Sequence, residues 1–525
     1  MSCSKIFSGD LPELTYEIIK YFQNDFSTLY SCILVNRLWC RLAIPLLWED
    51  PFSFPIENYN YNFIEIYLHN LNDDLKTELN KYKINDNTIQ SNALFNYPKF
   101  LKYLNIYNII SSIEKWFKAN VRNSNPSERY LSVYDFKILI NKSLFKIFIE
   151  NEVNLHTLEI EISNNSFNTY LNNILELILQ NRNFIHNIKN LKLYIDNNNP
   201  YNDNILSDLS YHNDSNEYTL MESRILTTNS FTLYQSLLLS NDFNCTNTLK
   251  TIIFYQVSFE VMIHLDKAFE QLNVLESVHI LYCSLNTGFT QQIINLTKPF
   301  KLKSLFINNI SQIESLQLII QKFGDYLENF GYNFLFDFNI SLKKHLLGLI
   351  TKYCKNIKLL DLHGNDSRNI FPVLNLIENT KKNLNYLSIS KDCLLLNNDI
   401  EFSSLILQNL GQILPSKLEY LNLILHIKTS DFKVFLENSQ NTFIEKLLIM
   451  QKGRDNILHC VKEYIMKKKR VKHLAITNTF IVRYVENDDL SNFENEVKEF
   501  KLHNIKVQSY SNLRTNVYDF VKKIY

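Results

Sequence analysis

The chain is poor in glycine, with 8 glycines among its 525 residues, whereas an average protein contains about 7%. The closest two, Gly324 and Gly331, are too far apart for a G-x-G-x-x-G dinucleotide fingerprint. No pair fits the phosphate-binding pattern G-x-x-x-x-G-K-[ST] either. Both motifs need glycine because the backbone must approach a phosphate closely. Enzymes that hold nucleotides in either of these ways are therefore excluded.

Paired cysteines and histidine motifs are also missing. The eight cysteines are scattered, without a C-x-x-C pair or a histidine at zinc-finger spacing. The 12 histidines include no H-E-x-x-H and no compact cluster with cysteine or acidic residues, which are the patterns of metal sites. We therefore expect single buried thiols in a reducing compartment, and neither a metal nor another cofactor.

Neither sign of charge is in excess, because 54 Lys and Arg residues balance 54 Asp and Glu residues. A balanced chain has no global field that attracts nucleic acid or an anionic membrane, so we expect neither as a partner. The first residues lack an apolar stretch of signal-peptide length, and no run of about 18 uncharged apolar residues follows. We expect an intracellular protein in the cytoplasm, the nucleus or both.

The sequence does contain a short pattern that recurs from LKYLNI at Leu101 to VKHLAI at Val471. Each copy has apolar residues at its first, fourth and sixth positions. One copy alone is weak evidence for a repeat. If roughly 0.4 of residues are apolar at each of the three positions, about 30 matches are expected by chance in a chain of this length. The fourth residues of the copies are Leu104, Leu158, Leu191, Ile252, Val278, Leu305, Phe330, Leu360, Leu387, Leu421, Leu447 and Leu474.

The spacing of the copies is the stronger signal. Counted in sequence positions, the steps from Ile252 to Leu387 are 26, 27, 25, 30 and 27, and those from Leu387 to Leu474 are 34, 26 and 27. The step of 54 between Leu104 and Leu158 is twice 27. Most steps lie within or just beyond the range of about 20 to 29 residues that is typical of leucine-rich repeats.

Each copy is interpreted as a short strand with alternate residues in the core, followed by a helix that covers it. Such units cannot bury their apolar sides alone, so neighbours stack. The predicted fold is therefore an α/β leucine-rich-repeat solenoid, or horseshoe, over residues 101–480. A polar segment at 196–217 is interpreted as a surface insertion. Residues 481–525 would form a C-terminal cap.

Residues 8–50 show helical periodicity instead, and residues 51–100 are expected to form a helical linker or N-terminal cap. Pro12 stands in the first turn of a predicted helix, where its missing N–H does no harm. Asp25 begins a second helix, and a third runs from Val35 towards Pro45. Three short helices make only a marginal core, which gains stability by docking against a partner or the rest of the chain.

A specific order of residues lies in this segment: Leu11-Pro12, Glu17-Ile18, a polar turn at Asn24-Asp25, Leu34-Val35-Asn36-Arg37 and Trp39. This order resembles the F-box motif. The following Ile44-Pro45-Leu46-Leu47-Trp48-Glu49 looks like that of F-box/leucine-rich-repeat proteins in expanded fungal families.

The resemblance implies a substrate-recognition subunit of an SCF-type cullin-RING ubiquitin ligase. The F-box would bind the ligase adaptor subunit, and through it a cullin, while the repeats bind a target protein. The chain would have no catalytic residue, because it only raises the concentration of a target lysine near a ubiquitin-charged enzyme. The adaptor-binding residues would be Leu11, Pro12, Ile18, Leu34, Val35 and Trp39.

Two other functions remain open on the residues alone. One is a non-ligase repeat scaffold for protein–protein interaction, in which the first helices are only a cap. The other is an enzyme hidden in the repeats, for which the sequence offers no nucleotide loop, metal triad or nucleophile elbow.

The target-binding residues are expected at strand positions that alternate with the core positions. His279 and His363 fall between inward residues and should therefore face the exposed side. The candidates are Glu159, His279, Phe306, Asp361, His363 and Asn422, with Lys192, Ser388, Leu448 and Ala475 on the same predicted face. These residues share no charge or chemical type, so the sequence does not identify the target.

Overall fold

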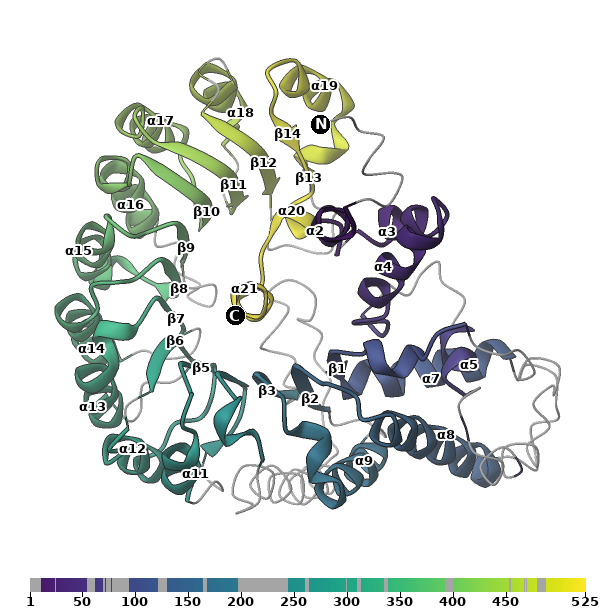
Figure 1. Ribbon diagram of the computed structural model, residues 1–525. Helices are drawn as coiled ribbons and strands as arrows, with labels where there is room; N and C mark the ends of the chain where they lie inside the picture. The colour runs from purple at the N-terminus through teal and green to yellow at the C-terminus, as the bar shows by residue number, and fades with distance from the viewer. Residues whose placement is uncertain are drawn as a thin grey trace. The chain divides into compact units, whose positions relative to one another are not determined.

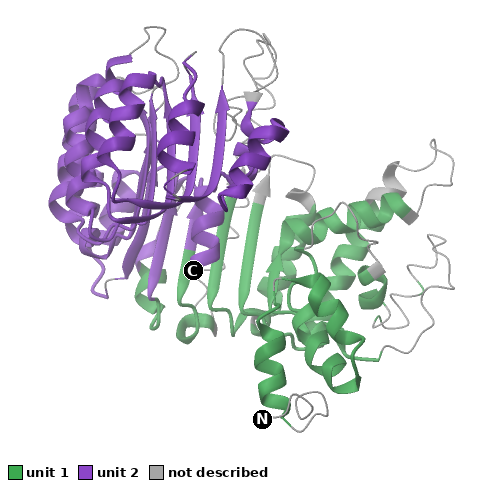
Figure 2. Cartoon of the chain, turned by 90° about the horizontal axis from the view of Figure 1, so that it is seen from above, with its two compact units in different colours: residues 1–252, 267–275 green, residues 253–266, 276–525 purple. Residues whose placement is uncertain are grey.

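Two units make up the structure, which is a computed structural model. Unit 1 comprises Met1–Ile252 and Lys267–Leu275, and unit 2 comprises Ile253–Asp266 and Glu276–Tyr525 (Figure 2). Apart from Asp196, the expected insertion at 196–217 lies outside the described residues. The structure describes residues 11–23, 25–53, 62–68, 71, 77, 94–120, 130–163, 168–196, 244–259, 264–298, 300–308, 313–334, 339–391, 400–452, 455–466, 468, 470–478 and 488–525.

Three helices begin unit 1: α2 (Pro12–Lys20), α3 (Phe26–Ile33) and α4 (Arg37–Leu47). Proline starts α2, and the side chains of Asp25 and Asn36 cap α3 and α4 by accepting hydrogen bonds from backbone N–H groups. Such caps stabilise a helix by about 1 kcal/mol each. Helix α4 continues past Pro45 instead of ending there. The helices share a buried cluster of Ile19, Leu29, Cys32, Ala43 and Leu46.

Parallel strands and helices fill the rest of unit 1. Strands β1 (Tyr103–Asn105), β2 (Thr157–Ser163) and β3 (Asn190–Asp196) pair in chain order. The other elements are α5 (Asn62–Leu68), η2 (Tyr97–Phe100), α7 (Ile106–Asn120), α8 (Tyr130–Glu150), α9 (Asn168–Gln180), η4 (Arg182–Ile185) and η5 (Asn244–Asn247). Strand β4 (Thr251–Tyr255) and helix α11 (Leu265–Gln271) have residues in both units.

The long step between Leu104 and Leu158 is one repeat and not two. These leucines are direct partners in β1 and β2, with α7 and α8 between them in sequence. The interpretation as two repeats of the ordinary length is therefore wrong, because a second helix takes up the extra length.

Unit 2 repeats a strand and a helix in chain order. Its parallel strands are β5 (Ser277–Leu281), β6 (Lys301–Ile307), β7 (Asn329–Asn333), β8 (Leu359–Asn365), β9 (Tyr386–Lys391), β10 (Lys417–Leu425), β11 (Phe443–Gln451) and β12 (Val471–Asn478). The intervening helices are α12 (Thr287–Ile294), α13 (Ile313–Phe323), α14 (Ile340–Tyr353), α15 (Ile370–Thr380), α16 (Ile400–Ile413), α17 (Thr429–Asn438) and α18 (Leu458–Val461). Short 3-10 helices η7 (Gly324–Tyr326) and η8 (Ser367–Asn369) and a π-helix, η9 (Lys462–Met466), adjoin them. Figure 1 shows α12 to α17 side by side on one face of this sheet. The fold is mixed α/β and solenoid-like.

The strand register of unit 2 follows the apolar period. Leu305, Phe330, Leu360, Leu387, Leu421, Leu447 and Leu474 are successive register partners, and all are fully buried. One strand departs from the pattern, since Leu305 pairs with Ile280 and not with Val278. The register shifts between Val278 and His279, as it does where a β-bulge adds a residue to one strand only.

Helix starts are less well predicted than strands. The sequence Ser430-Asp431 looks like a capped start, but α17 begins before the serine, at Thr429, and its N-cap Lys428 makes no side-chain capping bond. The N–H of Thr429 donates instead to Asp455 Oδ2, 2.9 Å away. An acidic side chain from a neighbouring repeat thus satisfies one orphan donor of this helix.

Short elements cover the outer edge of β12. Strand β13 (Asp488–Asp489) pairs antiparallel with its end, and β14 (Lys506–Val507) pairs parallel with its start. Helix α19 (Glu494–Leu502) connects them through η10 (Leu490–Asn492). Unpaired N–H and C=O groups at the edge of a sheet can pair with another strand. Strands β13 and β14 reduce the number of such groups on β12.

The chain then turns onto the sheet face opposite α12 to α17, called the strand face below. Helices α20 (Tyr510–Leu513) and α21 (Val517–Ile524) lie there (Figure 1). Tyr510 and Leu513 join a buried cluster of outward strand residues, Tyr420, Ile424, Leu448, Met450 and Ala475. Among the described residues, no helix is both long and apolar enough to cross a lipid bilayer.

Candidate functional site

Several predicted adaptor-binding residues are exposed on the first helices. Leu34 is 72% exposed, and Ile18 and Val35 are exposed as well. Leu11 and Pro12 are half-buried. Trp39 is also half-buried and packs against the buried cluster of α2 to α4, so it holds the helices together.

Three further exposed apolar residues were not predicted. Leu14, Tyr21 and Tyr30 are exposed, with exposed fractions of 92% for Tyr21 and 62% for Tyr30. Leu14, Ile18 and Tyr21 follow the spacing i, i+4, i+7, which places them on one side of α2. The neighbouring Ile19 is fully buried on the other side. The periodicity of α2 therefore contained this signal, because the helix has apolar residues on two sides.

The predicted target-binding residues are buried, so the expectation that they are exposed is wrong. In unit 2 this holds for His279, Phe306, Asp361, His363 and Asn422, and in unit 1 for Glu159. Alternation along each strand does turn these residues away from the helices, but other side chains cover them. In unit 2, part of this cover is the segment 509–525, called the strap below.

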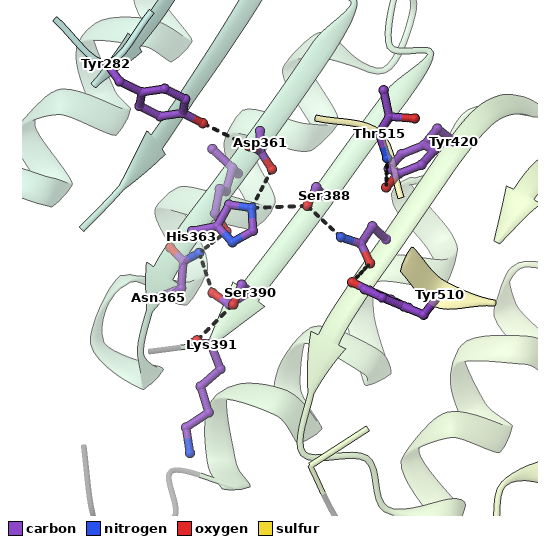
Figure 3. A network of polar contacts seen from close by, with 12 residues as sticks. Tyr282, Asp361, His363, Asn365, Ser388, Ser390, Lys391, Tyr420, Tyr510 and Thr515 are labelled. Atoms are coloured by element: carbon purple, nitrogen blue, oxygen red, sulfur yellow. Dashed lines mark hydrogen bonds and ion pairs between the residues drawn. The ribbon is translucent and has the colours of Figure 1, made fainter. Parts of the chain in front are cut away.

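A hydrogen-bonded chain of side chains connects the strap to the strand face (Figure 3). The Tyr510 hydroxyl donates to Asn422 Oδ1 at 2.8 Å, and Asn422 Nδ2 donates to Ser388 Oγ at 3.2 Å. Ser388 Oγ lies 3.3 Å from His363 Nε2. His363 Nε2 in turn lies 2.6 Å from Asp361 Oδ1. The network therefore links Tyr510 to three neighbouring strands.

Tyr282 reaches the far end of this network because its backbone is in the left-handed region. Its φ is 54°, a conformation that costs a non-glycine residue roughly 1–2 kcal/mol. Its N–H donates to Phe306 O at 2.7 Å, and its hydroxyl donates to Asp361 Oδ2 at 3.4 Å. Gln256, one repeat earlier, has φ 56° and donates to Leu281 O in the same way. The turn is therefore a repeated feature.

The Asp361, His363 and Ser388 side chains do not form a catalytic triad. In a Ser-His-Asp triad the serine and the aspartate bond to opposite ring nitrogens, whereas here both oxygens lie on Nε2. His363 Nδ1 is buried and has no hydrogen-bond partner among the described residues. This arrangement holds the ring by one edge and leaves the other nitrogen for a hydrogen bond.

The charge of Asp361 is stabilised despite its burial. Burial raises the pKa of this carboxyl, but the charge and hydrogen bond of His363, a hydrogen bond from Ser388 and the charge of Arg514 lower it. The net result is a pKa below the usual value of 3.8. The strand face thus presents a carboxylate, and a strap cation is close enough to affect it.

The other end of the strap is anchored at Glu328. The Tyr525 hydroxyl donates to Glu328 Oε2 at 3.0 Å, and the centre of its ring lies 4.2 Å from that of the His279 ring. Lys303 and Lys358 also bond to the carboxylate. Burial raises the pKa of Glu328, but the hydrogen bonds from both lysines and from the tyrosine outweigh it and lower the pKa to about 2.

Phe306 is covered within the sheet and fills the space above a glycine. Its strand partner is Gly331, which pairs on the other side with Asp361. A Cβ at Gly331 would lie 2.6 Å from Phe306 Cδ1 and 2.7 Å from Asp361 O. Only glycine leaves room for the phenylalanine ring at this position.

In unit 1, Glu159 also lies in a sheet interior. Its register partner in β3 is Lys192, and both side chains are buried. Opposite charges on directly opposite strand residues stabilise a sheet, by up to about 1 kcal/mol. The position therefore has a structural role in addition to any contact with a target.

Cys283, which follows β5, is buried, in line with the expectation of single buried thiols. Its Sγ lies 3.4 Å from Leu281 O and 3.5 Å from Phe254 O. Burial raises the pKa of the thiol to about 12, so the nucleophilic thiolate is disfavoured near neutral pH. Among the described residues, no group of three or more His, Cys, Asp and Glu side chains is placed to hold a metal ion.

The fold and the site define a parallel α/β repeat array with apolar residues exposed on its first helices. No protein-family model matches the chain, and no curated protein matches it.

Proposed function

We propose that the chain is the substrate-recognition subunit of an SCF-type cullin-RING ubiquitin ligase. In this proposal, α2 to α4 are an F-box that binds the ligase adaptor subunit, and the strands and helices are leucine-rich repeats that bind a target protein. The chain carries out no bond chemistry itself. It works in the cytoplasm, the nucleus or both.

The exposed apolar residues of α2, α3 and the turns that follow them carry the proposal. They are Leu14, Ile18, Tyr21, Tyr30, Leu34 and Val35. Large exposed apolar patches are typical of protein interaction sites. Ile18 and Leu34 are the informative pair, because they are not needed for the buried cluster that holds the helices together. Their exposure supports a docking function.

A repeat array supports the second half of the proposal. Its strands place side chains from many repeats on one extended face, which is how such arrays bind partners. A receptor of this kind raises the local concentration of a target lysine near the charged enzyme, and tethering alone supplies effective concentrations of about millimolar.

The test is recovery of the adaptor subunit and of a cullin with the full-length chain from cells. We expect both to copurify with the wild-type chain. The variant Ile18→Asp/Leu34→Asp should lose both, because charges in an apolar interface cost several kcal/mol. Both residues are exposed, so the variant should fold.

A matched control is Phe371→Asp/Leu502→Asp, which changes two exposed apolar residues of unit 2. It should recover the adaptor and the cullin as the wild type does. If the wild-type chain brings down target proteins but never a cullin, the chain is a non-ligase scaffold and the proposal is wrong.

A further inference from the structure

The strand face contains two rows of polar side chains that are buried. His279, Ser304 and Asn329 follow one another across three strands, as do Asp361, Ser388 and Asn422. All six side chains are buried. Burying polar groups costs free energy unless each is hydrogen-bonded, so a permanent interior usually consists of apolar residues. This face instead has the composition of a binding surface.

The strap contacts the face through the ends of side chains. The Tyr518 ring lies 4.8 Å from the Tyr255 ring, and the Phe520 ring lies 4.4 Å from the Tyr386 ring in an edge-to-face arrangement. The Lys303 ammonium lies 5.5 Å from the centre of the Tyr525 ring. Aromatic ring pairs in such arrangements are stabilising beyond the burial of their area.

The strap differs along its length. The α20 end is part of a buried apolar cluster with β10 to β12. The α21 end has one buried side, with Phe520 and Val521, and exposes Asp519, Lys523 and Ile524. So short a helix is not stable alone, and α21 therefore depends on the ring contacts. This part of the strap is the part that can separate from the face.

The fit between strap and face is also incomplete. His363 Nδ1 is buried without a hydrogen-bond partner among the described residues, which costs free energy. A ring nitrogen of histidine can donate or accept a hydrogen bond. A ligand that places a matching hydroxyl or amide group there gains a hydrogen bond that the strap does not make.

We propose that the strap is a resident ligand of the strand face, and that a protein target binds by displacing α21 with a segment of the same chemistry. That segment carries aromatic side chains at the spacing of Tyr518, Phe520 and Tyr525, whose rings contact Tyr255, Tyr386 and His279. The inference rests on the proposed function only in that the strand face binds a target.

A tethered strap competes strongly, because its effective concentration is about millimolar. A free peptide with the same contacts should therefore bind the intact chain weakly. Weakening the strap without touching the face should expose the site. Tyr518 and Tyr525 suit this purpose, since both are only half-buried and their loss leaves the α20 cluster intact.

The experiment measures binding of a fluorescent synthetic peptide of residues 515–525, which spans α21, to the full-length chain. The full-length variant Tyr518→Ala/Tyr525→Ala should bind the peptide at least tenfold more tightly than the wild type, at one site. The control Tyr326→Ala removes an exposed tyrosine outside the strap and should bind it as weakly as the wild type. Adding Glu328→Ala to the strap variant should weaken peptide binding, because the terminal tyrosine of the peptide then loses the partner that Tyr525 has in the chain; this locates the peptide on the strand face.

A folded strap variant that binds the peptide no better than the wild type would overturn the inference. If that variant does not fold, hydrogen exchange of the wild-type chain decides. The amides of α21 should exchange at least a hundredfold faster than those of β8 and β9, because α21 opens locally. Equal protection would show that the strap is a fixed part of the core. Adaptor binding involves α2 to α4 and is measured in a separate experiment. Loss of adaptor binding would therefore contradict the proposed function without changing the result of the peptide experiment.

Discussion

The hydroxyl of Tyr525 donates a hydrogen bond to Glu328 across 197 residues of sequence. The same carboxylate accepts from Lys303 and Lys358. One acidic side chain thus joins three neighbouring strand starts to the strap. Its low pKa makes this junction sensitive to acid.

Glu328→Gln should make unfolding less dependent on pH below about 4.5. The wild-type carboxyl has a pKa of about 2 in the folded state against 4.5 when unperturbed. Between these values the unfolded chain binds a proton that the folded chain does not, so stability is present above pH 4.5 and is lost as pH falls towards 2. Urea unfolding at pH 7, 4.5 and 3 should show a smaller decline for the glutamine variant. An equal decline in both proteins would show that Glu328 is not responsible.

Gly331→Ala should destabilise unit 2 by about 1–3 kcal/mol, the usual cost of overpacking a core. The added methyl group meets the Phe306 ring and the Asp361 carbonyl, and neither the strand backbone nor a buried ring moves easily. Urea unfolding followed by circular dichroism measures the effect.

Gly348→Ala is the matched control and should have the opposite sign. This glycine lies inside α14, where an added Cβ meets nothing within 4 Å. Alanine in an exposed helix interior stabilises by about 0.5–1 kcal/mol relative to glycine. If both alanine variants destabilise equally, the close approach of Phe306 to Gly331 is not the cause.

Tyr510→Phe should lower the free energy of unfolding by about 1–3 kcal/mol, because Asn422 Oδ1 then lacks its donor in a buried site. The ring and its contacts in the apolar cluster remain. Tyr326→Phe removes an exposed hydroxyl instead and should change stability by less than about 0.5 kcal/mol. Equal values for the two variants would mean that water replaces the Tyr510 hydroxyl at no cost.

The strands were predictable because each inward residue must be apolar in every repeat. Leu387, Leu421 and Leu447 are both period markers and register partners. A local sequence pattern cannot show that the strap covers the strand face, because the contacting residues are far apart in sequence. Tyr510 lies 88 residues from Asn422. His279 and His363 are therefore polar residues at outward positions, as predicted, and yet they are buried.

The first helices show the same limit. Asp25 was recognisable as a helix start because its carboxylate caps the backbone N–H of Thr28. Whether Ile18 or Ile19 is buried depends on how the three helices pack. Two adjacent isoleucines in the sequence do not determine that packing. The structure places Ile19 in the shared cluster and leaves Ile18 exposed.

The most direct test of the proposed ligase function is calorimetric titration of the full-length chain with the purified adaptor subunit. We predict saturable one-to-one binding by the wild type and by Leu502→Asp, and a loss of about 2 kcal/mol or more with Leu34→Asp. Absence of binding by a folded wild-type chain, or equal affinity of Leu34→Asp and the wild type, would contradict the proposal.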